Sequence, residues 1–395
     1  MTDRASLTED PAEDTGPVLK AVVDITTVDA EAWDGCAGTE NPFVRHAFLA
    51  ALERSGSVAA ETGWLPQHLV LEAPDGRVLG CVPAYLKNHS YGEYVFDHGW
   101  AHAFERAGGD YYPKLQVSVP FTPVTGPRLL VAPGEDDAAV SRILATGLRA
   151  LCERHDASSV HVTFPEEAQW ALLGEEGWLQ RTGHQYHWLN DGYATFDDFL
   201  AALSSRKRKA IKKERQKARE SGVAIEVLTG NALTEDHWDA FFGFYMDTGS
   251  RKWGTPYLTR TFFSLLGETM ADQVALVMAK DEDRWVAGAL NLIGGDALYG
   301  RNWGCDGYYK FLHFEACYYQ AIDFAIARGL ARVEAGAQGE HKLQRGYMPT
   351  RTFSAHWIRH PGLRAAVADY LDRETQAVDG EIEALSAYAS PFRKT

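Results

Sequence analysis

The stretch QVALVMAKDEDRWVAGALNLI, residues 273–293, holds two strand-like runs on either side of a short charged turn. An earlier stretch, QHLVLEAPDGRVLGCVPAYLK at 67–87, has the same plan, with Pro-Asp-Gly at its turn. Strand-forming runs around a turn of this kind indicate a β-hairpin. The second run of each hairpin also contains a glycine in a small-residue step, Gly80 in one and Gly288 in the other. The chain therefore contains the same supersecondary unit twice.

The segments that follow each hairpin repeat in the same order, which extends the duplication to most of the chain. Each half continues with an extended segment, an amphipathic helix, a strand and a closing strand. The predicted counterparts are helices at about 136–155 and 312–328, strands at 158–164 and 331–336, and closing strands with His187-Trp188 and His356-Trp357, ten residues after Gly177 and Gly346.

This order of elements predicts an α/β (α+β) protein built from two similar domains, 21–192 and 193–395. Each domain is expected to hold a mainly antiparallel mixed sheet flanked by helices. Residues 1–20 are polar and acidic, and we expect a disordered tail there. The alternative is one large α+β domain without duplication.

The second half opens with a concentration of positive charge, SSRKRKAIKKERQKARESG at 204–222. Nine of the fourteen residues 206–219 are Arg or Lys, although the whole chain has 39 basic and 54 acidic side chains and a net charge of −15. The pattern from Phe199 to Gly222 predicts one basic helix with a narrow apolar stripe and little internal compensation of its charge. Two interpretations stay open: contact with phosphate or nucleic acid, or a solvated helix face.

The remaining composition excludes several classes of protein. Five scattered cysteines without a CxxC pair indicate neither a zinc site nor a disulfide framework. The scattered cysteines are those expected of a protein in the reducing cytoplasm. No apolar run reaches the roughly 18 residues of a membrane helix, and the first twenty residues do not resemble a signal peptide. The motifs of serine hydrolases, dinucleotide enzymes and P-loop NTPases do not occur.

Five long stretches carry a resemblance to a known family. They are HSYGEYVFDHGW (89–100), YYPKLQVSVPFTPVTGPRLL (111–130), GRNWGC (300–305), KFLHFEACYYQAIDF (310–324) and GAQGEHKLQRGY (336–347). With the basic segment and the repeated element order, they resemble the FemAB-like group of the GNAT acyltransferase superfamily, in the family labelled peptidoglycan biosynthesis or recognition. The resemblance covers nearly the whole chain after the tail and implies two tandem GNAT-like domains.

The resemblance implies an N-acyltransferase that joins an activated acyl or aminoacyl group to an amine, such as that of a cell-wall precursor. Two donors stay open: aminoacyl-tRNA, which the basic helix would face, and acyl-CoA. Residues 301–306 match the Q/R-x-x-G-x-G/A phosphate loop of ordinary GNAT enzymes only loosely, because Asp306 brings a carboxylate to its last position. No tightly bound cofactor is expected. The competing class is a non-catalytic protein that recognises a cell-wall precursor or nucleic acid, and the oligomeric state is left open.

Amide formation needs a neutral amine, a hydrogen-bond donor for the oxyanion, and two aligned substrates. Lys342 follows a glycine-containing loop after a strand, as the FemAB lysine does, and Glu340 and His341 beside it are titratable. His313 and Glu315 form an H-x-E pattern without the P-C-x-x-C partner of zinc deaminases, so no metal site is predicted. The candidates are: catalytic, Lys342, Glu340 and His341; donor-binding, Arg206, Arg208, Lys209, Lys212, Lys213, Arg301 and Asn302; acceptor-binding, Tyr94, Asp97, His98, Trp303, His313 and Glu315.

Overall fold

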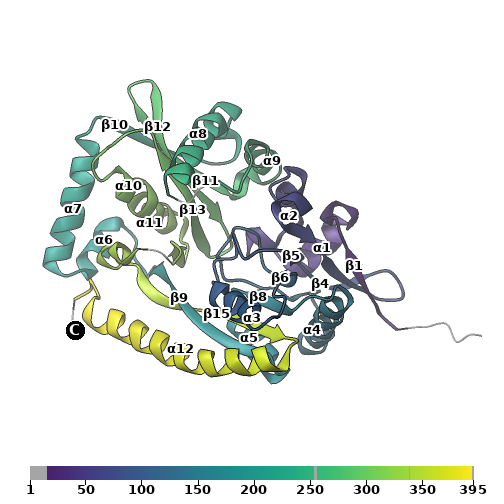
Figure 1. The fold of residues 1–395 in the computed structure, drawn as a ribbon. Coiled ribbons are helices and arrows are strands. Elements are labelled where there is room, and N and C mark those ends of the chain that lie inside the picture. Colours follow the sequence, from purple (N-terminus) through teal and green to yellow (C-terminus); the bar gives the residue numbers. More distant parts are fainter. Residues whose placement is uncertain (1–15, 253–255, 338, 394–395) are drawn as a thin grey trace, which may run out of the picture.

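The computed structural model describes residues 16–252, 256–337 and 339–393, except the side chains of residues 250–252 and 340. Its centre is an eleven-stranded sheet in the order β10-β11-β12-β13-β14-β9-β15-β8-β6-β5-β2 (Figure 1). A four-stranded sheet has the order β1-β3-β4-β7. The strands are β1 Val18–Val22, β2 Trp64–Pro66, β3 His68–Glu72, β4 Val78–Val82, β5 Ala84–Lys87, β6 Lys114–Val117, β7 Leu130–Val131, β8 Ser159–Thr163, β9 Leu179–Leu189, β10 Val223–Leu228, β11 Val274–Asp281, β12 Arg284–Ile293, β13 Ala297–Cys305, β14 Arg332–Glu334 and β15 Met348–Ile358.

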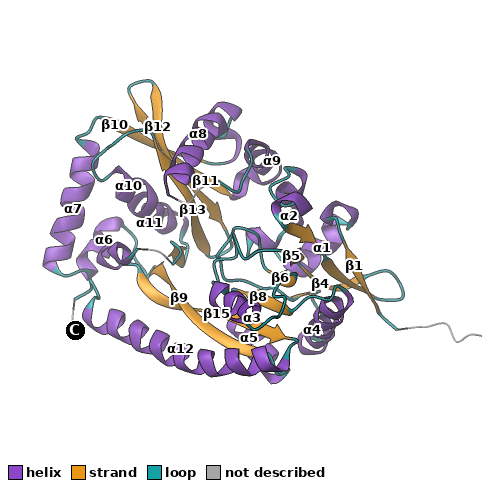
Figure 2. Ribbon diagram, in the orientation of Figure 1, coloured by secondary structure: helices purple, strands orange, loops and turns teal. Residues whose placement is uncertain are grey.

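Helices cover both faces of the main sheet, so the molecule has the layered arrangement of a mixed α/β protein (Figure 2). The α-helices are α1 Ala30–Ala37, α2 His46–Arg54, α3 His98–Arg106, α4 Asp137–Arg154, α5 Glu167–Glu175, α6 Phe196–Ala202, α7 Ser205–Arg219, α8 Glu235–Lys252, α9 Arg260–Met270, α10 Leu312–Phe314, α11 Gln320–Arg328 and α12 Pro361–Tyr388. A π-helical turn, Glu315–Tyr319, joins α10 to α11, and a 3₁₀ helix spans Glu340–Arg345.

Both predicted hairpins form, but they are placed differently. In the second half, β11 and β12 pair antiparallel within the main sheet. In the first half, β3 and β4 pair in the smaller sheet, while the adjoining β2 and β5 pair in the main sheet. The hairpin changes sheets at Gln67 and Pro83, where proline has no N–H to continue a ladder. The predicted helices and strands that follow each hairpin are also present, at α4 and β8 and at α10–α11 and β14.

The last strand of each half lies in the sheet of the other half. The first-half strand β9 pairs antiparallel with β14, and the second-half strand β15 pairs antiparallel with β8. The two exchanged strands also pair with each other, from Met348↔His187 to His356↔Leu179, at the centre of the sheet (Figure 1). Helix α12 packs along both of them. Residues of the first half therefore reach the interior of the second, and the reverse.

The predicted basic helix forms as α7, but the prediction of one continuous helix from Phe199 is wrong, because the chain breaks at Leu203 and Ser204 and a separate helix, α6, precedes the break. Leu203 has an extended backbone and bridges to Phe392, and the Ser204 amide donates to the carbonyl of Pro391 at 2.9 Å. Pairing with the distant C-terminal segment thus overrides the local helical pattern. The predicted apolar stripe of this helix comprises Phe199, Leu203, Ala210, Ile211 and Ala218, and it fails at Ala210, which is exposed.

The predicted acidic tail ends earlier than residue 20. Residues 18–20 belong to β1, which pairs antiparallel with β3 from Val18↔Glu72 to Val22↔His68. Lys20 also forms an ion pair with Glu72. Pairing with an available sheet edge orders this part of the chain, and residues 1–15 of the predicted tail lie outside the described residues.

Candidate functional site

The second half contains a notch where two neighbouring strands separate. Strands β13 and β14 run parallel and pair from Ala297↔Arg332 to Tyr299↔Glu334. Strand β14 ends there, whereas β13 continues to Cys305. Just past the last pair, two residues of β13, Arg301 and Asn302, lie opposite the single residue Leu290 of β12, which makes a β-bulge. Bulges of this kind occur beside active sites, where they redirect a side chain.

Lys342 lies at this notch, on the 3₁₀ helix that follows β14. Its ammonium donates to the carbonyls of Ala335 and Gly336, the latter at 3.2 Å, just past the end of β14. The side chain is buried, and the described residues give the ammonium no carboxylate partner. Burial lowers the pKa of Lys342 to about 8, against a small opposing effect of Cys317. The group is therefore mainly protonated at neutral pH but readily loses its proton.

Three further candidates gather beside Lys342 in a cluster of aromatic and imidazole rings. The ring of His313 lies 5.3 Å from Trp303, 5.4 Å from Tyr318 and 6.1 Å from His341. The Tyr318 hydroxyl and His341 Nε2 are 3.0 Å apart. The sequence-predicted His341, His313 and Trp303 therefore meet, although they come from three different segments. The side chain of Glu340 lies outside the described part of the chain.

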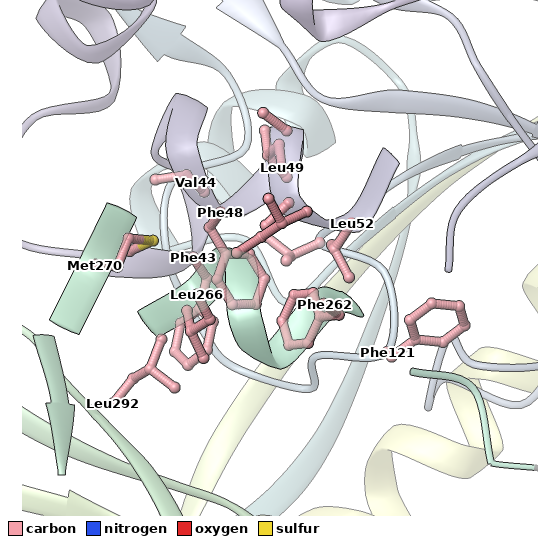
Figure 3. Packing of buried hydrophobic residues seen from close by; sticks show 14 of the residues in the cluster. Phe43, Val44, Phe48, Leu49, Leu52, Phe121, Phe262, Leu266, Met270 and Leu292 are labelled. Carbon is pink, nitrogen blue, oxygen red and sulfur yellow. The ribbon is translucent and has the colours of Figure 1, made fainter. Parts of the chain in front are cut away.

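Arg301 and Asn302 face the boundary between the halves. Arg301 Nη2 donates to the carbonyl of Phe121 at 2.5 Å and to Thr122 Oγ1 at 3.4 Å, and burial lowers the pKa of Arg301. A narrow apolar pocket adjoins it, within the cluster that Figure 3 shows around Phe48 and Phe262. The pocket is lined by Phe43, Phe48, Leu52, Pro120, Phe121, Thr122, Leu258, Phe262, Leu266, Leu290, Leu292, Arg301 and Asn302. Arg301 thus joins the two halves at the bulge.

The predicted acceptor residues of the first half do not form one cluster. Asp97 is buried and accepts hydrogen bonds from Lys114 Nζ at 2.5 Å and from the Tyr111 hydroxyl at 2.7 Å, so it lies in a buried charge network. Burial would raise the pKa of Asp97, but Lys114 holds it well below its usual range. Tyr94 is exposed, and the half-buried His98 stacks on the exposed Phe96. Only Tyr94 and His98 are therefore placed to meet a ligand at the surface.

Glu315 is also unavailable to a ligand, because it is 1% exposed and forms a salt bridge with the guanidinium of Arg215. Arg215 Nη2 is 2.9 Å from Glu315 and 2.6 Å from Asp323. Glu214, the one acidic residue of α7, instead accepts from Arg345 at 2.9 Å, so its charge is used by a cation outside the helix. Acids from other segments therefore compensate Arg215 on the inner face of the basic helix α7.

The outer face of α7 keeps its charge. Arg206, Lys209 and Lys213 are exposed there, while Lys212 lies 3.2 Å from Asp197 and Arg208 donates to the carbonyl of Leu203. The inner face reaches the Lys342 segment through Lys207, which donates to Gln344 at 3.0 Å, and through Glu214 and Arg345. Helix α7, which carries the basic surface, is thus joined by hydrogen bonds and a salt bridge to the segment that holds Lys342.

The corresponding notch of the first half is filled. Strands β6 and β8 run parallel there, from Leu115↔Val160 to Val117↔Val162, as β13 and β14 do. Beyond them, the fully buried Arg128 donates to the carbonyls of Thr163 at 2.9 Å and Val124 at 2.6 Å. Only the second-half notch therefore combines an open pair of strands with a cluster of titratable side chains.

Sequence reasoning missed two residues at the second-half notch, His187 and Glu334. They face each other across the last β14–β9 pair, with His187 Nε2 3.7 Å from Glu334 Oε2. The repeated His-aromatic pair drew attention to His187 only as a landmark of the duplication. No local pattern signalled Glu334, because its partner lies on an exchanged strand.

Over the described ranges, no group of three or more His, Cys, Asp or Glu side chains is arranged to hold a metal ion. A helix long and apolar enough to cross a membrane is likewise absent from the part of the chain that the structure describes.

The fold is that of a duplicated GNAT-like protein, as the sequence predicted. The chain belongs to the FemAB-like family, because the model of that family matches residues 24–394. The family is described as one of peptidoglycan biosynthesis or recognition. Solved structures similar to this chain include that of FemX, with a TM-score of 0.53 and 11% identity over 86% of this chain and 97% of that chain. The structure of L-PGS from Bacillus licheniformis is similar with a TM-score of 0.50 and 10% sequence identity, and the match covers 85% of this chain and 98% of that chain. The C-terminal domain of a putative lysylphosphatidylglycerol synthetase from Agrobacterium fabrum is similar with a TM-score of 0.50 and 8% sequence identity, and the match covers 87% of this chain and 95% of that chain. Among curated proteins, no sequence matches this chain.

Proposed function

We propose that the protein is an N-acyltransferase that forms an amide between an activated acyl or aminoacyl group and an amine of a peptidoglycan precursor. The observation that carries the proposal is the buried ammonium of Lys342 at the point where β13 and β14 separate. A cation held in a water-poor site stabilises negative charge far better than it does in water. Family membership supports the precursor as the source of the amine.

In this reaction the amine nitrogen attacks the donor carbonyl, and a C–N bond forms as the C–O bond of an ester or the C–S bond of a thioester breaks. The Lys342 ammonium would stabilise the oxyanion and give a proton to the departing oxygen or sulfur. Its lowered pKa of about 8 suits proton donation near neutral pH. The ring cluster around His313 and His341 would flank the donor.

The donor of this proposal carries phosphate. The exposed cations Arg206, Lys209 and Lys213 lie on the helix that contacts the Lys342 segment. Such a face favours a polyanion over a neutral donor, with a strong dependence on salt. Aminoacyl-tRNA is the donor we favour, and acyl-CoA is the other arm of the test.

The experiment measures transfer to a precursor peptide with a free lysine amine, with aminoacyl-tRNA and acetyl-CoA as parallel donors. Lys342→Met is expected to lower kcat about 10²–10³-fold, the usual effect of losing an oxyanion partner. Lys20→Met, on the distant strand β1, is the matched control and is expected to keep full activity. Precursor binding without transfer from either donor would reject the enzyme and favour the non-catalytic binding protein.

A further inference from the structure

His187 and Glu334 form a buried pair with unused hydrogen-bonding capacity. Their side chains are 6% and 4% exposed, and His187 Nε2 lies 3.7 Å from Glu334 Oε2, which is too long for a direct hydrogen bond. The other carboxylate oxygen of Glu334 accepts from Arg332 Nε at 2.9 Å. Within the described part of the chain, His187 Nε2 and Glu334 Oε2 have no hydrogen-bond partner. A buried polar atom left unpaired destabilises the fold, so the pair indicates a place for a water or a ligand atom.

The pair lies where β13 and β14 separate. Glu334 is the last residue of β14 and pairs with Tyr299, after which β13 departs. Lys342 lies just beyond, because it donates to the carbonyls of the next two residues of the chain. The His187–Glu334 pair and the ammonium of Lys342 therefore lie on either side of the place where β13 and β14 separate.

The first half shows that the fold does not require ionisable residues here. In each half, the residue after the short strand donates its amide to the exchanged strand: Ala335 to Tyr186 at 3.1 Å, and Phe164 to Phe353 at 2.9 Å. Glu334 and His187 therefore correspond to Thr163 and Ser354 of the first half. Those two side chains are neutral and satisfied, because Thr163 Oγ1 accepts from Gln116 at 3.0 Å and Ser354 Oγ lies 3.0 Å from His356 Nε2.

The charges around the pair set its protonation. Burial lowers the pKa of His187, Arg332 and Lys342 lower it further, and Glu334 opposes them. Arg332 also pairs with Asp296, and its Nη2 lies 3.4 Å from the Tyr299 hydroxyl. The imidazole is therefore neutral at neutral pH and able to accept a proton, while Lys342 still carries one. Two titratable groups with opposite roles on either side of a site are the usual arrangement for acid–base chemistry.

We propose that His187 accepts the proton that the attacking amine must lose, through a water held between its unpartnered Nε2 and Glu334 Oε2. The proposal rests on the proposed amide-forming function. A protonated amine loses two protons as the C–N bond forms and the ester or thioester bond breaks. One passes through His187 to solvent, and the other replaces the proton that Lys342 gives to the leaving group, so the reaction releases one proton in total.

The test compares two amines of different basicity. A lysine side chain is protonated at neutral pH and needs a base, whereas hydroxylamine is largely unprotonated there and does not. With the donor that the wild type uses, His187→Gln is expected to slow transfer to a lysine peptide about 10²–10⁴-fold, the usual contribution of general-base catalysis. Transfer to hydroxylamine is expected to change little. Glu334→Gln should show the same selectivity with a smaller loss.

His184→Gln is the matched control, since His184 lies on the same strand but on its opposite face. Equal losses with both amines would assign His187 a structural role and overturn the inference, as would full activity of His187→Gln with the lysine peptide. Wild-type protein that transfers to neither amine from aminoacyl-tRNA or acetyl-CoA would instead reject the proposed function, and the proton-accepting role would fall with it.

Discussion

Arg128 closes the first-half notch, and its replacement should be among the costliest single changes in the chain. The guanidinium is fully buried and donates to four backbone carbonyls: Thr163 at 2.9 Å, Gly126 and Pro127 at 3.1 Å, and Val124 at 2.6 Å. Burial lowers the pKa of Arg128 to about 10, which reflects a cation solvated by carbonyls instead of water.

The size of the effect follows from these contacts. Arg128→Met keeps a long side chain but removes every donor, and each buried carbonyl left unsatisfied costs about 1–3 kcal/mol. Folding of the variant no longer desolvates a cation, which offsets several kcal/mol of that loss. We expect a net decrease of about 3–5 kcal/mol in the free energy of unfolding, which is what remains of the cost of the unsatisfied carbonyls after that offset.

The assay is urea unfolding followed by tryptophan fluorescence, with Arg142→Met as the matched control. Arg142 is 44% exposed and pairs with Glu175 and Glu176 at the surface, so its replacement should cost at most about 1 kcal/mol. A change below about 1 kcal/mol for Arg128→Met, or one equal to that of the control, would refute the view that hydrogen bonds from this cation to carbonyls hold residues 124–127 in place.

Two further predictions concern other buried cations. Arg215→Met leaves Glu315 buried without its counter-ion and is expected to lower the free energy of unfolding by about 3–5 kcal/mol, whereas Arg219→Met on the exposed face of the same helix should change it by about 0.5 kcal/mol or less; similar losses in urea unfolding would contradict this. Burial lowers the pKa of Lys87 from 10.5 to about 7, against the attraction of Glu93, so the unfolded chain binds more protons between those values and wild-type stability should rise with pH across that window. Thermal unfolding of Lys87→Met over the same range should lack this rise, and an identical pH profile for both proteins would show that Lys87 is not the cause.

The parts of the fold that the sequence predicted are those set by local pattern and tight packing. The two glycines that marked the repeat have a physical reason in the structure. A Cβ at Gly80 would lie 2.8 Å from Val140 of α4, and one at Gly288 would lie 2.7 Å from Phe241 of α8. Each hairpin thus needs a residue without a side chain where a helix crosses it. The shared glycine in the two hairpins therefore reflects the same close packing of a helix against a strand in each half.

The features that the sequence did not predict depend on distant contacts. The break between α6 and α7 is imposed by residues 391–392, and the compensation of the basic helix comes from acids about a hundred residues away, such as Glu315. Among the predicted site residues, those on neighbouring segments of the second half came together, namely Lys342, His341 and His313. Asp97 and Glu315 did not join them, because each is paired with a buried cation, Lys114 and Arg215 respectively. The sequence alone does not show whether a carboxylate has such a partner.

The strand exchange explains why the two halves can differ so sharply at one position. His187 belongs by sequence to the first half, but β9 carries it into the second-half sheet beside Glu334. The reverse exchange brings Ser354 beside Thr163. Each notch is therefore built from both halves, and a substitution in one half alters the site of the other. One notch therefore holds the neutral side chains of Thr163 and Ser354 and is filled by Arg128, while the other holds an imidazole, a carboxylate and an ammonium where the strands separate. The difference between the two notches, more than any single residue, is the reason for placing the proposed chemistry in the second half.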